Sequence, residues 1–70
     1  MTEYTVIFEQ GPSSWSAYVP DLPGCVAAAE TRDATAVLMA EAIRLHIDLM
    51  RDDGDPIPPP RSHAGLVAVA

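Results

Sequence analysis

The sequence has no lysine, only one cysteine and only four aromatic residues. A lone cysteine excludes an intrachain disulfide, so the fold must be stabilised by packing, by a metal or by association with another chain. Four arginines stand against ten carboxylates, and the net charge of -6 at pH 7 opposes contact with phosphate backbones. We therefore expect no nucleic-acid binding by this chain.

Long hydrophobic runs are absent too. No apolar run reaches the roughly 20 residues that a membrane-spanning helix needs, and residues 1–10 lack the basic and apolar regions of a signal peptide. The expected location is the cytoplasm, without membrane contact. A 70-residue chain buries only about 60% of the surface that its unfolded form exposes, so its stability is marginal. This favours association with a second protein molecule.

The apolar pattern predicts three strands, a helix and a final strand. Residues 2–10 and 15–19 alternate on either side of a Gly-Pro turn, and residues 25–30 follow as a weaker strand. A helix over residues 31–51 begins at the capping residue Thr31, and a proline-rich extended segment returns the chain over residues 55–60. Residues 66–70, LVAVA, are typical of a buried parallel strand. The expected fold is α+β, a two-layer βββαβ arrangement in one domain of residues 1–70, with one helix on a small mixed sheet.

The run VPDLPGC, residues 19–25, places two prolines and a glycine around the cysteine. Each proline holds the preceding residue in extended geometry, and Pro23-Gly24 fits the central positions of a type II turn. We predict a rigid corner that leads into the third strand, with Cys25 as its first inward residue. Trp15 and Tyr18 lie on opposite strand faces, so one should pack inward while the other stays accessible.

The predicted helix carries an apolar surface over about half of its circumference. Two neighbouring stripes make up this surface: Leu38, Ala42, Leu45 and Leu49, and Met39, Ile43, Ile47 and Met50. One small sheet cannot cover so wide a surface, which predicts a homo-oligomer, a dimer or a tetramer. We expect His46, Ile47 and Met50 at the self-association contact. A histidine in this position is usually a satisfied core or interface residue, and the alternative is that His46 titrates at that contact.

Three groups of residues could carry chemistry, and each is incomplete. Cys25 has no base supplied by the nearby sequence, and a free cysteine is commonly a small buried residue. Cys25, His46 and His63 are separated by 21 and 17 residues, which matches no short zinc pattern. The order of strands and helix also resembles ribonuclease H, which binds two metal ions through carboxylates. Glu9 and Glu41 of this chain could mimic two of those carboxylates. The LVAVA segment supplies no acid, so a two-metal site cannot be completed. We predict no catalytic residue, no metal, no cofactor and no enzymatic activity.

Several residues follow one another in an order typical of a known family. They are Trp15, Ala17, the run Val19-Pro20-Asp21-Leu22-Pro23-Gly24-Cys25, Thr31, Glu41-Ala42-Ile43, Leu45-His46, Gly54, Ile57-Pro58 and Pro60. This order resembles the HicB antitoxin domain over most of the chain, from about Tyr4 to Pro60. The PDLPGC run and the later proline segment carry most of the specificity.

The resemblance implies a βββαβ fold that is related in outline to ribonuclease H but lacks its active site. It also implies an antitoxin that binds a small, basic HicA-type ribonuclease toxin and covers its active surface. Many family members self-associate, and many carry a further C-terminal DNA-binding module, which we do not expect here because the sequence ends after its predicted fourth strand. The alternative is a solitary HicB-like oligomeric domain that serves another protein partner.

An acidic chain is suited to a basic protein partner, because opposite potentials steer encounter. The residues expected to contact that partner surround the proline corner. They are Trp15, Tyr18, Pro20, Asp21, Leu22 and Pro23.

Overall fold

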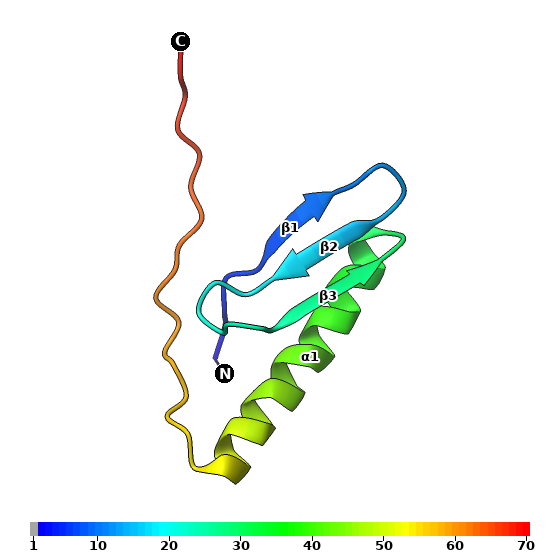
Figure 1. The fold of residues 1–70 in the computed structure, drawn as a ribbon. Coiled ribbons are helices and arrows are strands. Elements are labelled where there is room, and N and C mark those ends of the chain that lie inside the picture. Colours follow the sequence, from blue (N-terminus) through cyan, green and yellow to red (C-terminus); the bar gives the residue numbers. More distant parts are fainter. Residues whose placement is uncertain (1) are drawn as a thin grey trace.

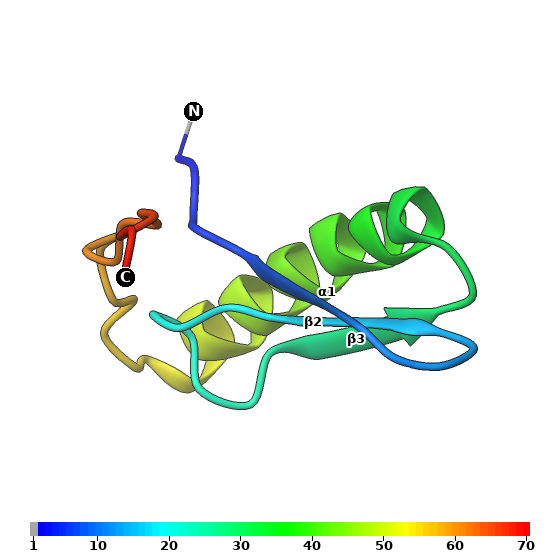
Figure 2. The same ribbon diagram turned by 90° about the horizontal axis from the view of Figure 1, so that it is seen from above.

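The computed structural model describes residues 2–70, which form three strands and one helix (Figure 1). The strands are β1 (Ile7–Gln10), β2 (Trp15–Tyr18) and β3 (Val26–Ala29), and the helix is α1 (Arg32–Asp53). The sheet is antiparallel in the order β1-β2-β3, and α1 lies across one face of it, mainly against β3 and β2 (Figures 1 and 2). The α+β class and the order of three strands followed by a helix are confirmed.

The predicted strand at residues 66–70 does not form. The part of the chain after Gly54 contains neither helix nor strand, and Leu66, Val67 and Val69 are 103%, 87% and 90% exposed. Figure 1 shows the C-terminal end of this part, coloured red, extending away from the body of the molecule. The prediction of a buried parallel strand is wrong for the single chain, because no neighbour among residues 2–70 supplies the backbone hydrogen bonds of a ladder. The sheet is therefore antiparallel instead of mixed, and the likeness to ribonuclease H is not confirmed.

The strand register separates the two faces of the sheet. Phe8 pairs with Ala17, and Ala17 pairs with Ala27, in a row that faces the helix and joins the core. Because side chains alternate along a strand, the row formed by Ile7, Tyr18 and Val26 lies on the opposite face.

The core lies between the helix and the sheet. Its buried apolar members come from β2, the proline corner and α1: Ala17, Val19, Leu22, Cys25 and Met39. Thr35 is the buried polar residue, and its hydroxyl donates to the carbonyl oxygen of Thr31 at 2.7 Å. Partly buried side chains that pack around this core are Tyr4, Val6, Phe8, Ala27, Ala42, Ile43, Ile47 and Met50.

Both ends of α1 are capped. The amide of Ala34 donates to the Thr31 hydroxyl at 3.1 Å, as predicted for an N-cap. At the other end, Gly54 adopts a left-handed conformation with φ of 74°, and the amide of Asp55 donates to the carbonyl of Met50 at 2.9 Å. A 22-residue helix is about 33 Å long, whereas a four-residue strand spans about 13 Å, so α1 extends well past the sheet. No helix in residues 2–70 combines the length and apolar character needed to span a bilayer.

Candidate protein-interaction site

The proline corner is a closed loop between β2 and β3. The amide of Val19 donates to the carbonyl of Cys25 at 3.2 Å, and the amide of Leu22 donates to the carbonyl of Val19 at 3.1 Å. The amide of Cys25 donates to the carbonyl of Leu22 at 3.1 Å, and Gly24 has φ of 84°. These are the features of a type II turn centred on Pro23 and Gly24, so the predicted turn is confirmed.

The six residues predicted to contact a partner separate into two groups. Tyr18 is 41% exposed, and Pro20 and Pro23 are exposed on the outside of the corner. Leu22 is 0% exposed, so the prediction of a contact role is corrected: its side chain fills the core. Trp15 is partly buried on the helix side of the sheet, whereas Tyr18 lies on the open side, as their opposite strand faces predict.

Asp21 has an internal role that the sequence did not reveal. Its Oδ2 accepts hydrogen bonds from the amides of Arg61 and Ser62, both at 2.9 Å, and its Oδ1 accepts from the Ser62 hydroxyl at 2.9 Å. Donation by the Ser62 amide, and next by the Arg61 amide, stabilises the carboxylate and lowers the pKa of Asp21 below its ordinary value. Both oxygens of the Asp21 carboxylate thus accept hydrogen bonds from within the chain.

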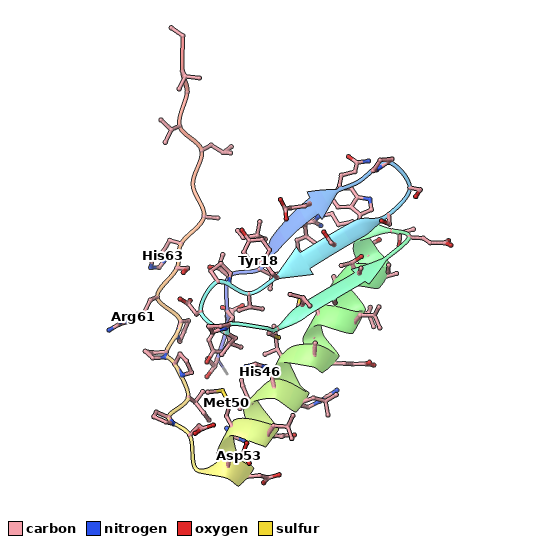
Figure 3. All side chains as sticks on the ribbon, viewed as in Figure 1. Tyr18, His46, Met50, Asp53, Arg61 and His63 are labelled. Carbon is pink, nitrogen blue, oxygen red and sulfur yellow. The ribbon has the colours of Figure 1, made fainter. Side chains whose placement is uncertain are left out.

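Two further side-chain hydrogen bonds attach the return segment, residues 55–62, to the N-terminal part of the chain. The Tyr4 hydroxyl donates to the carbonyl of Pro58 at 2.6 Å, and the Thr5 hydroxyl donates to the carbonyl of Ser62 at 2.6 Å. With the Asp21 contacts, these bonds hold the proline-rich segment beside the start of β1. In Figure 3, Arg61 and His63 lie on this side of the molecule.

The sheet face opposite the helix carries an open apolar row. Ile7 pairs with Tyr18, and Tyr18 pairs with Val26, so the three side chains form a line across all three strands. Ile7 is partly buried, Tyr18 is 41% exposed and Val26 is 63% exposed. No helix covers this face (Figure 2). Sequence reasoning did not select Ile7 or Val26, although Ile7 stands out as the apolar residue on the otherwise polar side of the first strand, which it shares with Thr5 and Glu9.

The sheet covers one part of the apolar surface of α1 and leaves the other part exposed. Met39, Ile43, Ile47 and Met50 belong to the side that packs against the core. Ile47 and Met50 are partly buried against their own chain, and their role in self-association stays a prediction. His46 is partly buried on the same side of the helix. The exposed apolar residues of the helix are Val37 at 63%, Leu38 at 43%, Leu45 at 63% and Leu49 at 63%.

The C-terminal end of α1 is strongly acidic. Asp48, Asp52, Asp53 and Asp55 are exposed there, and Figure 3 shows Asp53 at the tip of the helix. The ion pair between Arg51 and Asp48 is long, at 3.9 Å, and both side chains are more than half exposed. The helix dipole adds partial negative charge at the same end.

The residues considered for chemistry are not brought together. Among residues 2–70, no group of three or more His, Cys, Asp or Glu side chains is placed to hold a metal ion, and no pocket is found. Cys25 is 3% exposed, and burial raises the pKa of its thiol.

A sheet of three antiparallel strands on one helix, with an apolar row on its open face and a rigid corner, defines a small two-layer α+β domain. The family described as "HicB_like antitoxin of bacterial toxin-antitoxin system" matches residues 4–69, and the chain belongs to this family. The resemblance to the HicB antitoxin domain is thereby confirmed.

A protein of Haemophilus phage HP1 (strain HP1c1) is also similar to this chain. Its name is "Uncharacterized 14.9 kDa protein in rep-hol intergenic region", and it is 33% identical over 55 residues. The similar region covers 79% of this chain and 41% of the phage protein, so the chain spans about two fifths of that relative's length. No solved structure matches the chain.

Proposed function

We propose that this chain neutralises a small, basic ribonuclease toxin of the HicA type in the cytoplasm by covering its active surface, and that it catalyses no reaction itself. Membership of the HicB-like antitoxin family supports an antitoxin role. The observation that carries the contact proposal is the open row of Ile7, Tyr18 and Val26.

This row has the properties of a protein contact. Its members are held in register by the sheet, so little conformational entropy is lost when a partner packs on them. Tyr18 combines an apolar ring with a hydroxyl group, and tyrosine is enriched among residues that dominate binding energy. Pro20 and Pro23 follow directly at the end of β2, where the closed corner presents them in a fixed geometry.

The remaining predicted residues support this surface from within. Trp15 packs on the helix side of β2, Leu22 fills the core and Asp21 holds the return segment. The proposal therefore keeps Tyr18, Pro20 and Pro23 as contact residues and adds Ile7 and Val26.

The net charge of -6 and the acidic end of α1 provide long-range attraction for a basic partner. Complementary potentials raise the association rate and are screened by salt. We expect the association rate to fall as ionic strength rises, while the dissociation rate changes little.

The test has two parts, which are growth rescue by co-expression with a small, basic, histidine-containing protein, if one is encoded beside this gene, and a binding measurement on the purified pair. Val26→Asp on the open sheet face should weaken binding by about 100-fold and abolish rescue, because a charge would be buried at the contact. Val37→Asp is the matched control, since Val37 on α1 has the same exposure of 63%.

Tyr18→Ala provides a second, uncharged change of the same surface, and circular dichroism checks that each variant is folded. Equal loss of binding from Val26→Asp and Val37→Asp would contradict the proposed face. Toxicity that the unaltered chain does not relieve would contradict toxin neutralisation itself.

The second candidate is a solitary HicB-like oligomeric domain, a dimer or a tetramer, that serves another protein partner. The exposed leucines of α1, Leu38, Leu45 and Leu49, favour some protein contact besides the sheet face. An isolated gene without a neighbouring basic protein would favour this candidate over the first.

A further inference from the structure

Two parts of the chain that lack backbone hydrogen-bond partners lie on the same side of the molecule. The outer edge of β1 has no backbone hydrogen-bond partner among residues 2–70, since the sheet ends there. The segment of residues 64–70, which we call the tail, is apolar and extended, and Leu66, Val67 and Val69 are almost completely exposed. An open edge and an unpaired apolar segment are complementary, because each has the backbone groups that the other lacks.

The point at which the tail leaves the body is well defined. Asp21 accepts from the amide and hydroxyl of Ser62, and Thr5 donates to the carbonyl of Ser62, so the backbone of Ser62 is held on both sides. Beyond this residue the chain diverges from β1 and extends outward (Figure 1). The four prolines of residues 56–60 restrict the backbone of the segment that leads to Ser62.

We propose that the tail forms the fourth strand of a second copy of this chain, pairing with the outer edge of that copy's β1, and that the two copies exchange tails reciprocally. A twofold contact brings the same patch of both copies together, and the tail leaves each copy beside its own β1. The contact thus brings the tail of each copy to the β1 edge of the other. The far edge of the sheet, β3, lies above α1 and away from this exit (Figure 1).

Length and composition fit this exchange. Seven extended residues span about 23 Å, more than the roughly 13 Å of the four-residue β1. In a strand, Leu66 and Ala68 share one face while Val67 and Val69 share the other, so both faces are apolar, as in strands that are covered on both sides. The tail has no charged side chain and Glu9 is the one charged residue of β1, so pairing of the two strands brings no like side-chain charges opposite each other.

The proposal is independent of any toxin, so it is tested on the full chain alone. In a Cys25→Ala background, one chain carries Val67→Cys in the tail and a second, larger tagged chain carries Glu9→Cys on β1. A short bismaleimide is added to the mixture, and the products are separated by size. The matched control replaces Glu9→Cys by Ala28→Cys on β3, because both residues lie in one row through Ser16, at opposite edges of the sheet.

We expect a mixed cross-linked dimer with Glu9→Cys and at least about tenfold less with Ala28→Cys. A chain that carries both Val67→Cys and Glu9→Cys should also link mainly between two molecules. Links within one molecule would show that the tail folds back on its own β1 and would overturn the exchange. Absence of any link to Glu9→Cys, or preferential linking to Ala28→Cys, would overturn it as well.

Sedimentation equilibrium provides a second measurement. The triple change Leu66→Ser, Val67→Ser and Val69→Ser should raise the dimer dissociation constant by more than about 100-fold, because three apolar side chains lose their burial. The corresponding change of Leu38, Leu45 and Leu49 to serine on α1 should leave the dimer intact. A monomeric unaltered chain, or dissociation only by the α1 changes, would refute the proposal.

Discussion

Asp21 and Ser62 are 41 residues apart in the sequence, yet the carboxylate of Asp21 accepts hydrogen bonds from both the amide and the hydroxyl of Ser62, each at 2.9 Å. This contact connects the proline corner to the proline-rich return segment, the two parts of the chain that contain most of its prolines. It holds the segment that follows α1 against the corner between β2 and β3.

Replacing Asp21 by Asn removes the charge and one acceptor from this contact. The Ser62 and Arg61 amides should then exchange their hydrogens at least about tenfold faster, since the weakened bonds allow local opening. Hydrogen exchange monitored by NMR measures this, and amides inside α1 serve as the internal reference. Unchanged exchange at Ser62 would mean that the carboxylate does not hold the segment.

The same contact should depend on pH in a defined direction. The pKa of Asp21 in the folded state is lowered by the donated amides, so the stabilisation is complete above the ordinary Asp pKa of about 3.9 and is lost as the pH falls through the lowered value. We expect the shift of the Asp21 carboxyl carbon to remain constant from pH 7 to about 4 and to change only below that. The Asp21→Asn variant should lack this transition, and a midpoint above pH 4 in the unaltered chain would contradict the prediction.

Leu22 and Leu45 provide a matched pair for testing the core. Leu22 is 0% exposed in the corner and Leu45 is 63% exposed on α1. Leu22→Ala should lower the free energy of unfolding by about 2–5 kcal/mol, while Leu45→Ala should change it by less than about 0.5 kcal/mol. Urea denaturation measures both. If Leu22→Ala does not fold, the milder Leu22→Met is expected to cost less than about 1.5 kcal/mol. Similar losses for Leu22→Ala and Leu45→Ala would show that Leu22 is not a core residue.

Gly24 tests the geometry of the corner. Its φ of 84° is disfavoured for residues with a Cβ, although no atom lies within 4 Å of the position that a Cβ would take. Gly24→Ala should therefore cost about 1–2 kcal/mol through backbone strain alone. Gly65→Ala has equally open surroundings without positive φ, and it should stay within about 0.5 kcal/mol of the unaltered chain. Thermal or urea denaturation would disprove the strain argument if both variants were equally stable.

Local signals allowed much of the fold to be predicted. The type II turn at Pro23-Gly24, the Thr31 cap and the helix end near Gly54 all depend on residues close together in the sequence, and the structure contains each of them. The helix continues to Asp53, two residues past the predicted end at Arg51, because the left-handed residue that terminates it is Gly54.

Contacts between distant residues were not predictable in the same way. Asp21 and Leu22 are neighbours in an exposed-looking corner, but one side chain turns to Ser62 and the other turns into the core. No periodicity distinguishes the two directions in an irregular loop. The LVAVA segment was predicted as a strand from composition alone, and a strand exists only where another strand offers its backbone groups.

The sequence by itself determined the three strands and the helix, the caps, the turn and the alternation that puts Tyr18 on the face opposite Trp15, because these follow from backbone preferences within a few residues. The tertiary structure decided which half of the α1 apolar surface the sheet covers, where Asp21 finds its donors, and that the tail finds no partner within residues 2–70. These outcomes depend on how separate elements meet in space, which local preferences do not specify.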